Sequence, residues 1–167
     1  MNWDQATNVI LCASFAVLAV FVILGLYQWI KQRSLKKVDR ELLWAPLPLA
    51  LMAAVYVIFD KFIVLNVRPN GSGESSFPST HVMVVATIFF LTFLILPKYI
   101  HKKSARIALE IAMLILLFLV CIGRVLSDMH WPIDVVGGLV FAFIFTEIYY
   151  LIIKKGAKNA QHLHQNH

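Results

Sequence analysis

The stretch Pro78–Pro97, PSTHVMVVATIFFLTFLILP, places a polar tetrapeptide directly before an apolar segment. Within the tetrapeptide, Ser79 or Thr80 can cap the N-terminus of a helix. The apolar residues after His81 continue to Ile100, close to the roughly 20 residues that a helix needs to cross a bilayer. This stretch therefore predicts a membrane-spanning helix that begins with a turn of polar groups.

The rest of the chain repeats this apolar pattern. Of its 167 residues, 60% are hydrophobic and only 14% charged, and the mean hydropathy is +0.76. This composition excludes an ordinary soluble domain and predicts an all-α, polytopic membrane helix bundle. We expect one membrane-embedded domain over residues 1–155 and a polar, disordered tail over residues 156–167. The five expected spans are Gln5–Ile30, Leu42–Val67, His81–Ile100, Ala105–Ile122 and Pro132–Ile153.

Basic residues are distributed unequally between the segments that join these spans. The net charge is +6, and no nucleic-acid-binding motif accompanies it. Because basic loops stay in the cytoplasm, we expect the N-terminus outside, the C-terminus inside and the protein in the plasma membrane. Twelve of the 15 Lys and Arg residues fall on the cytoplasmic side of this arrangement: Lys31, Arg33, Lys36, Lys37, Arg40, Lys98, Lys102, Lys103, Arg106, Lys154, Lys155 and Lys158.

The outer side keeps three basic residues, and two of them lie seven positions apart. Lys61 and Arg68 form the pattern Lys-x6-Arg-Pro. Arginine suits bidentate contacts with phosphate, and lysine adds charge without a fixed geometry. The alternative is that both side chains reach toward lipid head groups. A helix that begins near His81 adds free N–H groups and a positive dipole end, which also bind phosphate.

The third outer basic residue begins the pattern Arg124-x5-His130-x3-Asp134. The i, i+4 spacing lets the carboxylate of Asp134 reach the imidazole of His130. A carboxylate that accepts a hydrogen bond from one ring nitrogen fixes the tautomer and leaves the other nitrogen nucleophilic. A helix cap beside a surface histidine would have the same spacing.

Taken together, the three clusters resemble the phosphatidic acid phosphatase type 2 superfamily of membrane lipid phosphatases and related haloperoxidases. The family pattern is Lys-x6-Arg-Pro, then Pro-Ser-Gly-His, then Ser-Arg-x5-His-x3-Asp. Two positions depart from it, because Thr80 replaces the usual glycine and Gly123 the usual serine. Many membrane members have six spans, so the first span here has no certain counterpart.

The resemblance implies a metal-independent phosphatase without a cofactor. His130 would attack phosphorus and form a phosphohistidine, Asp134 would orient it, and His81 would protonate the leaving oxygen. The phosphoryl oxygens would be held by Lys61, Arg68, Arg124, Ser79 and Thr80. The substrate would be a membrane lipid phosphate handled at the outer face. Undecaprenyl pyrophosphate is the first expectation, and phosphatidylglycerol phosphate or phosphatidic acid are the alternatives.

Other classes of function stay open at this point. The cations could clamp a lipid head group in a binding or transport protein, although binding alone does not need the pair His130 and Asp134. A haloperoxidase-like enzyme would need vanadate. A metal site made of His81, His130 and Asp134 is disfavoured, because the nearby cations would repel a metal ion. No feature of the sequence specifies an oligomeric state.

Overall fold

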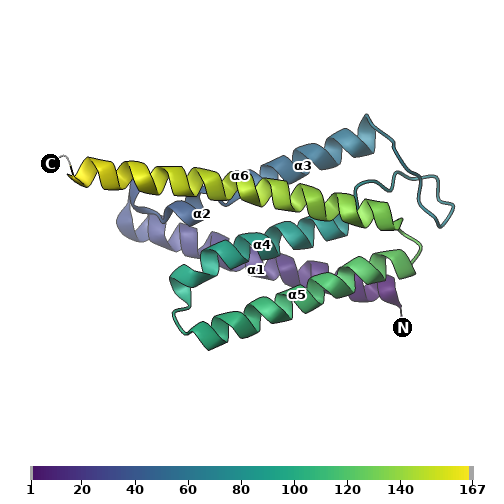
Figure 1. The fold of residues 1–167 in the computed structure, drawn as a ribbon, viewed down its shortest axis with the longest axis horizontal. Coiled ribbons are helices and arrows are strands. Elements are labelled where there is room, and N and C mark those ends of the chain that lie inside the picture. The colour runs from purple at the N-terminus through teal and green to yellow at the C-terminus, as the bar shows by residue number, and fades with distance from the viewer. Residues whose placement is uncertain (1, 166–167) are drawn as a thin grey trace.

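The computed structural model describes residues 2–165 as helices joined by short turns and one long loop (Figure 1). Within these residues no strand forms, apart from an isolated antiparallel bridge between Val67 and Ser75. Five helical segments of the described part of the chain are long and apolar enough to cross a membrane, and α2 with α3 counts as one of them. The predicted all-α, five-span membrane protein is confirmed. The elements are α1 (Trp3–Gln32), the 3-10 turn η1 (Leu35–Lys37), α2 (Arg40–Trp44), α3 (Pro46–Lys61), α4 (Thr80–Tyr99), α5 (Lys103–Leu126) and α6 (Pro132–Gln165).

Helix α4 is the centre of the bundle and contacts α1, α3, α5 and α6. Most of its side chains from Val82 near the start to Ile95 near the end are buried. The hydroxyl groups of Thr87 and Thr92 donate to the carbonyls of the preceding turn, so neither is left unpaired in the core. The outer helices expose apolar side chains such as Phe118, as expected of a surface that faces lipid.

The helices alternate in direction, so their termini gather at two opposite ends of the bundle (Figure 1). One end, here called the loop end, collects the start of α1, the end of α3, the starts of α4 and α6, and the end of α5. It also carries the long loop 62–79. The opposite end, here called the basic end, collects the segments that hold most of the basic residues. The three polar clusters therefore meet at the loop end, as a five-span arrangement requires.

A network at the basic end ties the helices together. Asp39 accepts hydrogen bonds from Gln28 at 2.7 Å and from Tyr99 at 2.6 Å, and it pairs with Lys98 at 2.8 Å. Arg40 donates to the carbonyl of Ile153 at 3.2 Å. These contacts join α1, α2, α4 and α6 at the end remote from the polar clusters, and so fix the frame that holds the loop end.

The second predicted span, Leu42–Val67, is not one helix. Pro46 begins α3 after the short helix α2, because a proline lacks the N–H that a continuous helix would use there. The helix ends at Lys61, so residues 62–67, which are apolar except for Asn66, lie in the loop. Arg68 therefore sits within a loop and not at a span end.

The C-terminal segment also differs from its prediction. Residues 156–165 were predicted as a disordered tail, but α6 continues through them to Gln165. The sequence there contains good helix formers such as Ala, Lys and Gln and no proline. Gly156 lies against the guanidinium of Arg40, so the helix still touches the bundle where the tail was expected to begin. The last two residues of the predicted tail, 166–167, lie outside the described residues.

Candidate active site

The long loop 62–79 is fixed to the loop end by backbone hydrogen bonds. The amide of Arg68 donates to the carbonyl of Glu74 at 3.1 Å, which closes the loop on itself. The amide of Asn70 donates to the carbonyl of Asp128 at 3.0 Å, and the indole of Trp131 donates to the carbonyl of Val67 at 2.8 Å. These contacts hold the first polar cluster against the turn between α5 and α6, where the third cluster lies.

A cavity of about 470 Å³ opens between these segments. Its polar lining comes from α1, α3, the long loop, α4, α5 and the turn before α6, and its apolar lining includes residues of α1 and α3. Four of the residues predicted to handle phosphate, Arg68, His81, Arg124 and His130, line it together, and Thr80 lines it as well. The remaining lining includes Asp4, Asn8, Leu11, Phe15, Tyr56, Phe59, Asp60, Ser76 and Met129.

His130 is buried at the wall of this cavity, with 4% of its side chain exposed. Its Nδ1 lies 2.8 Å from the carbonyl oxygen of Ser76. A carbonyl only accepts, so Nδ1 carries the proton and the neutral ring keeps its lone pair on Nε2. Burial, followed by the positive charge of Arg124, lowers the pKa of His130 to about 4. The imidazole is therefore neutral near pH 7, a state that suits the predicted role of nucleophile.

Asp134 does not make the direct hydrogen bond to His130 that its spacing predicted. Its nearer carboxylate oxygen lies 3.8 Å from Nδ1, and Ser76 takes that position instead. Asp134 is fully buried and accepts from the amide of Trp131 at 2.8 Å and from Asn66 at 3.0 Å. The bond to Trp131 caps the start of α6, and the bond to Asn66 holds the loop. The carboxylate thus holds the start of α6 and the long loop in place around His130.

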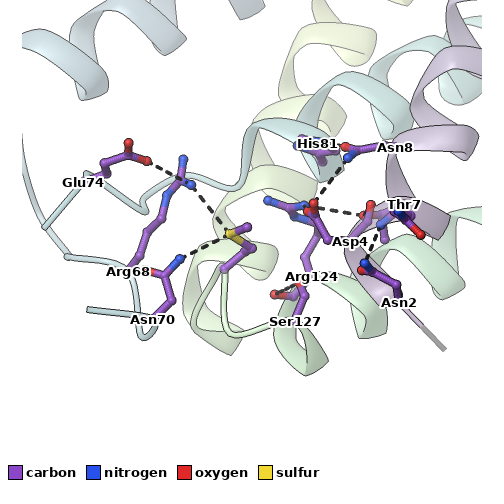
Figure 2. Close-up of polar contacts among 12 residues, drawn as sticks. Asn2, Asp4, Thr7, Asn8, Arg68, Asn70, Glu74, His81, Arg124 and Ser127 are labelled. Carbon is purple, nitrogen blue, oxygen red and sulfur yellow. Dashed lines mark hydrogen bonds and ion pairs between the residues drawn. The ribbon is translucent and has the colours of Figure 1, made fainter. Parts of the chain in front are cut away.

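His81, in the first turn of α4, has a different partner. Its Nε2 lies 2.7 Å from Oδ1 of Asn8 in α1 (Figure 2). The amide oxygen is an acceptor, so this nitrogen carries a proton and directs it toward the cavity wall formed by α1. The two histidines therefore differ in state: Nε2 of His81 is a donor, and Nε2 of His130 is an acceptor.

Arg124, near the end of α5, is almost fully buried, with 3% of its side chain exposed. Its Nη1 lies 2.6 Å from a carboxylate oxygen of Asp4 in α1 (Figure 2). Thr7, one turn further along α1, accepts a second and longer contact of 3.5 Å. A buried guanidinium requires a counter-charge, and α1 supplies it.

Arg68 approaches the cavity from the loop. It pairs with the exposed carboxylate of Glu74 at 3.0 Å, and its Nη1 also contacts the sulfur of Met129 at 3.7 Å (Figure 2). Among the described residues, the Nε atoms of Arg68 and Arg124 are buried without a hydrogen-bond partner, and so are the hydroxyl groups of Ser76 and Ser79. All four can donate, so this end of the bundle holds unused donors for an anion.

Lys61 is one of two predicted phosphate ligands, with Ser79, that do not line the cavity. Its side chain is 69% exposed and pairs with the neighbouring Asp60 at 2.8 Å. Asp60 lines the cavity, whereas Lys61 is absent from its lining. Lys61 lies on the last turn of α3, and its exposed ammonium group stands outside the cavity lining. The side chain is flexible and can rotate toward the cavity.

Ser79 and Thr80 form the start of α4. Ser79 is the N-cap residue, but its hydroxyl group makes no capping bond; its amide donates to the carbonyl of Asp134 at 2.9 Å. Gly138 of α6 lies so close that a Cβ there would be 2.9 Å from the Ser79 carbonyl oxygen. The cap is therefore packed directly against α6, and Thr80 beside it reaches the cavity.

Gly123 marks the place where α1 packs against α5. A Cβ at this position would lie 2.6 Å from a methyl carbon of Thr7 and 3.3 Å from the ring of Trp3. The departure from serine at this position thus has a structural cause, because α1 occupies the space that a larger side chain would need. The same close approach brings Asp4 to Arg124.

Four site residues were missed by sequence reasoning: Asp4, Asn8, Asn66 and Ser76. Asp4 and Asn8 lie four residues apart on α1, and this spacing was the only available signal. The contact of Ser76 is made by its backbone carbonyl, which has no sequence signature. Among the described residues, no group of three or more His, Cys, Asp or Glu side chains is arranged to hold a metal ion.

Comparisons with known proteins find similarity in both the sequence and the helical fold. A family model described as the PAP2 superfamily matches residues 60–158, which cover all three polar clusters. The chain therefore belongs to the PAP2 superfamily, and it is an integral membrane protein of that class.

Two particular proteins are similar to it. The bacitracin transport permease protein BcrC of Bacillus licheniformis is 38% identical over 65 residues, which span 39% of this chain and 27% of that protein. The chain thus matches about a quarter of that relative's length. The crystal structure of a transmembrane PAP2 type phosphatidylglycerolphosphate phosphatase from Bacillus subtilis has the same fold. It matches with a TM-score of 0.67 at 18% identity, over 93% of this chain and 77% of that one.

Proposed function

We propose that this protein is a membrane phosphatase that hydrolyses a phosphate ester or pyrophosphate of a membrane lipid through a phosphohistidine on His130. The observation that carries the proposal is the single cavity lined by two histidines and two arginines from separate parts of the chain. Membership of the PAP2 superfamily supports the same class of reaction. Positioned cations and donors can stabilise the charge of a phosphoryl transition state without a metal ion.

The first step forms a bond from Nε2 of His130 to phosphorus. This nitrogen has the free lone pair, because Nδ1 is held by the carbonyl of Ser76. The bond from phosphorus to the leaving oxygen breaks, and that oxygen takes a proton from His81, which enters the step as the imidazolium and leaves it as the neutral imidazole. Arg68 and Arg124 hold the phosphoryl oxygens as charge develops, and Ser79, Thr80 and Lys61 complete the proposed set of ligands. Lys61 reaches the phosphate only by turning away from Asp60.

The second step releases inorganic phosphate. Water attacks phosphorus while His81, now neutral, accepts its proton, and the bond to Nε2 of His130 breaks. His130 returns to its neutral form with the proton still on Nδ1. Each histidine is then in its initial state, and the net reaction is hydrolysis of one phosphorus–oxygen bond.

The substrate in this proposal is a lipid whose tail stays in the bilayer, since the cavity lies at the end of membrane-spanning helices and has apolar walls from α1 and α3. The excess of basic residues at the opposite end supports an active site on the extracytoplasmic face. Undecaprenyl pyrophosphate is the first candidate, by family analogy and topology. Phosphatidylglycerol phosphate is the alternative that the fold match favours, and phosphatidic acid is the third.

A second candidate function is lipid-phosphate binding or transport without hydrolysis. The word permease in the name of the Bacillus licheniformis relative favours it. In that function the arginines would hold a head group, and the opposite proton states of His81 and His130 would have no use. Release of inorganic phosphate therefore distinguishes a phosphatase from a binding or transport protein.

The test uses the purified full-length protein in detergent micelles with a panel of these three lipid phosphates. We expect release of inorganic phosphate that persists in EDTA, falls with vanadate and disappears in His130→Ala. Activity that is lost on chelation and restored by a divalent metal ion would contradict the metal-independent mechanism. Binding of every lipid without phosphate release would favour the second function.

A further inference from the structure

Asn8, in the second turn of α1, is the hydrogen-bond partner of His81. Its Oδ1 lies 2.7 Å from Nε2 of His81, and its Nδ2 lies 3.4 Å from Oδ2 of Asp4 (Figure 2). The other carboxylate oxygen of Asp4 lies 2.6 Å from Nη1 of Arg124. A chain of three contacts thus crosses the first two turns of α1, from the histidine of α4 to the arginine of α5.

The carboxylate of Asp4 fixes which end of the Asn8 amide faces His81. An ionised carboxylate only accepts hydrogen bonds, so the NH2 group of Asn8 turns toward Asp4 and the carbonyl oxygen toward the imidazole. That oxygen also only accepts, so Nε2 of His81 carries a proton in both the charged and the neutral ring. Asn8 therefore selects the Nε2–H tautomer of the neutral imidazole.

The proton that His81 exchanges with the substrate then belongs to its other ring nitrogen, Nδ1. His81 lines the cavity, and within residues 2–165 no hydrogen bond occupies this atom. The imidazolium gives the Nδ1 proton to the leaving oxygen while Nε2 stays bonded to Asn8. The neutral ring keeps its lone pair on Nδ1, and that lone pair takes the proton of the attacking water in the second step.

We propose that Asn8 is a positioning residue, which holds Nε2 of His81 so that Nδ1 gives and takes the proton of the reaction. The inference rests on the proposed function, because it takes His81 as the acid of the first step. It goes further in assigning α1 a part in the chemistry, since Asn8 lies outside residues 60–158, which the family model matches. Without this acceptor the ring is free to rotate or to adopt the Nδ1–H tautomer, in which Nδ1 accepts no proton.

The dependence of the rate on the leaving group distinguishes a positioning residue from a structural one. We compare Asn8→Leu, which has a similar shape but no acceptor, with Gln5→Leu, which replaces another exposed amide of α1 three residues earlier. Asn8 is itself exposed, so neither variant disturbs the core of the bundle. The measurement is kcat/KM of the purified full-length protein on phenyl phosphate, whose leaving group needs a proton, and on 4-nitrophenyl phosphate, whose leaving group departs without one.

We expect Asn8→Leu to lower kcat/KM on phenyl phosphate by about 10- to 100-fold, a part of what a general acid contributes. The value on 4-nitrophenyl phosphate should fall much less. Asn8→Asp keeps an oxygen acceptor for Nε2 of His81 and should recover most of the loss. Gln5→Leu should match the wild type on both substrates.

A spectrum of the imidazole tests the same inference without turnover. Long-range 1H–15N correlations of protein labelled at histidine report which ring nitrogen carries the proton, and His81→Gln identifies the signals of His81. At about pH 9 a histidine ring is neutral. We expect the Nε2–H tautomer of His81 in the wild type and a mixture of both tautomers in Asn8→Leu.

Three results would overturn the inference. Equal losses on the two aryl phosphates in Asn8→Leu would show that Asn8 only supports the fold. Unchanged kcat/KM on both substrates, or an Nδ1–H tautomer of His81 in the wild type, would show that Asn8 does not hold the ring. A wild-type protein that releases no phosphate from lipids or from aryl phosphates would instead refute the proposed function, on which the inference rests.

Discussion

The Nδ1 atom of His130 donates to the carbonyl oxygen of Ser76 at 2.8 Å, although the two residues are 54 positions apart. This bond joins the turn before α6 to the end of the long loop. A backbone carbonyl cannot donate in return, so the bond sets the tautomer of the imidazole. The free lone pair on Nε2 is the chemical basis for assigning His130, and not His81, as the nucleophile.

Replacing each of the two histidines by alanine should reduce phosphatase activity in a different way. His130→Ala should abolish both turnover and covalent labelling, a loss of at least about 10³-fold. His81→Ala should slow poor leaving groups most and an activated aryl phosphate least, because it removes a proton donor. The measurement is labelling with radioactive phosphate, acid quench and mapping of the acid-labile phosphohistidine. Label on His81, or label trapped in His130→Ala, would reverse the assignment.

The pH dependence of stability should reveal the lowered pKa of the buried His130 imidazole. The pKa of His130 is about 4 in the folded protein, against 6.5 for a solvated histidine such as that of the unfolded chain. The unfolded chain therefore binds the proton first, and the folded state loses stability as pH falls from about 6.5 to about 4. The loss is at most about 3 kcal/mol. We expect the wild type to lose more melting temperature over this range than His130→Gln in the same detergent. Equal losses would contradict the lowered pKa.

Substitutions of Asp134 and of Asn66 should distinguish a role in holding the loop from a role in catalysis. Asp134→Asn offers an amide group to one of two donors, so a buried donor loses its acceptor at a cost of about 1–3 kcal/mol. We expect both the melting temperature and the turnover number to fall. Asn66→Ala removes only the bond to the loop, so we expect lower stability with less loss of turnover. If Asn66→Ala is as inactive as Asp134→Asn, then Asp134 acts only by holding the loop.

The contact between Gly123 and Thr7 predicts a reversal of the usual effect of alanine in a helix. Replacing a helical glycine by alanine normally stabilises by about 1 kcal/mol. Gly123→Ala should instead destabilise by about 1–3 kcal/mol, because its Cβ meets the Thr7 methyl group. Thr7→Ser keeps the hydroxyl group and removes that methyl, so the double variant should recover part of the loss. Melting temperatures of the four proteins give the coupling; additive effects would show that α1 does not pack there.

Single cysteines in a background lacking Cys12 and Cys121 should define the topology. We expect an impermeant thiol reagent to label Ser72→Cys and Asp128→Cys in intact cells, but not Ser34→Cys or Lys102→Cys. Labelling at Ser34 without labelling at Ser72 would place the active site on the cytoplasmic face.

The sequence alone determined the membrane class, the five spans and the three clusters, because hydropathy and motif spacing are local properties of the chain. The same spacing also placed Arg68, His81, Arg124 and His130 at one end of the bundle, since helices that cross a membrane must alternate in direction. Their meeting in one cavity follows from that alternation together with the fold of the long loop.

Only the tertiary structure decided which partner each of these groups has. An i, i+4 spacing brings Asp134 near His130, but side-chain orientation and the path of the loop give the hydrogen bond to Ser76. Asp4 and Asn8 belong to an apolar helix that has no motif, so their contacts with Arg124 and His81 arise only from packing of α1 against α4 and α5. Lys61 matches its motif, yet its flexible, exposed side chain pairs with Asp60, because a charge at a helix end takes the nearest solvated partner.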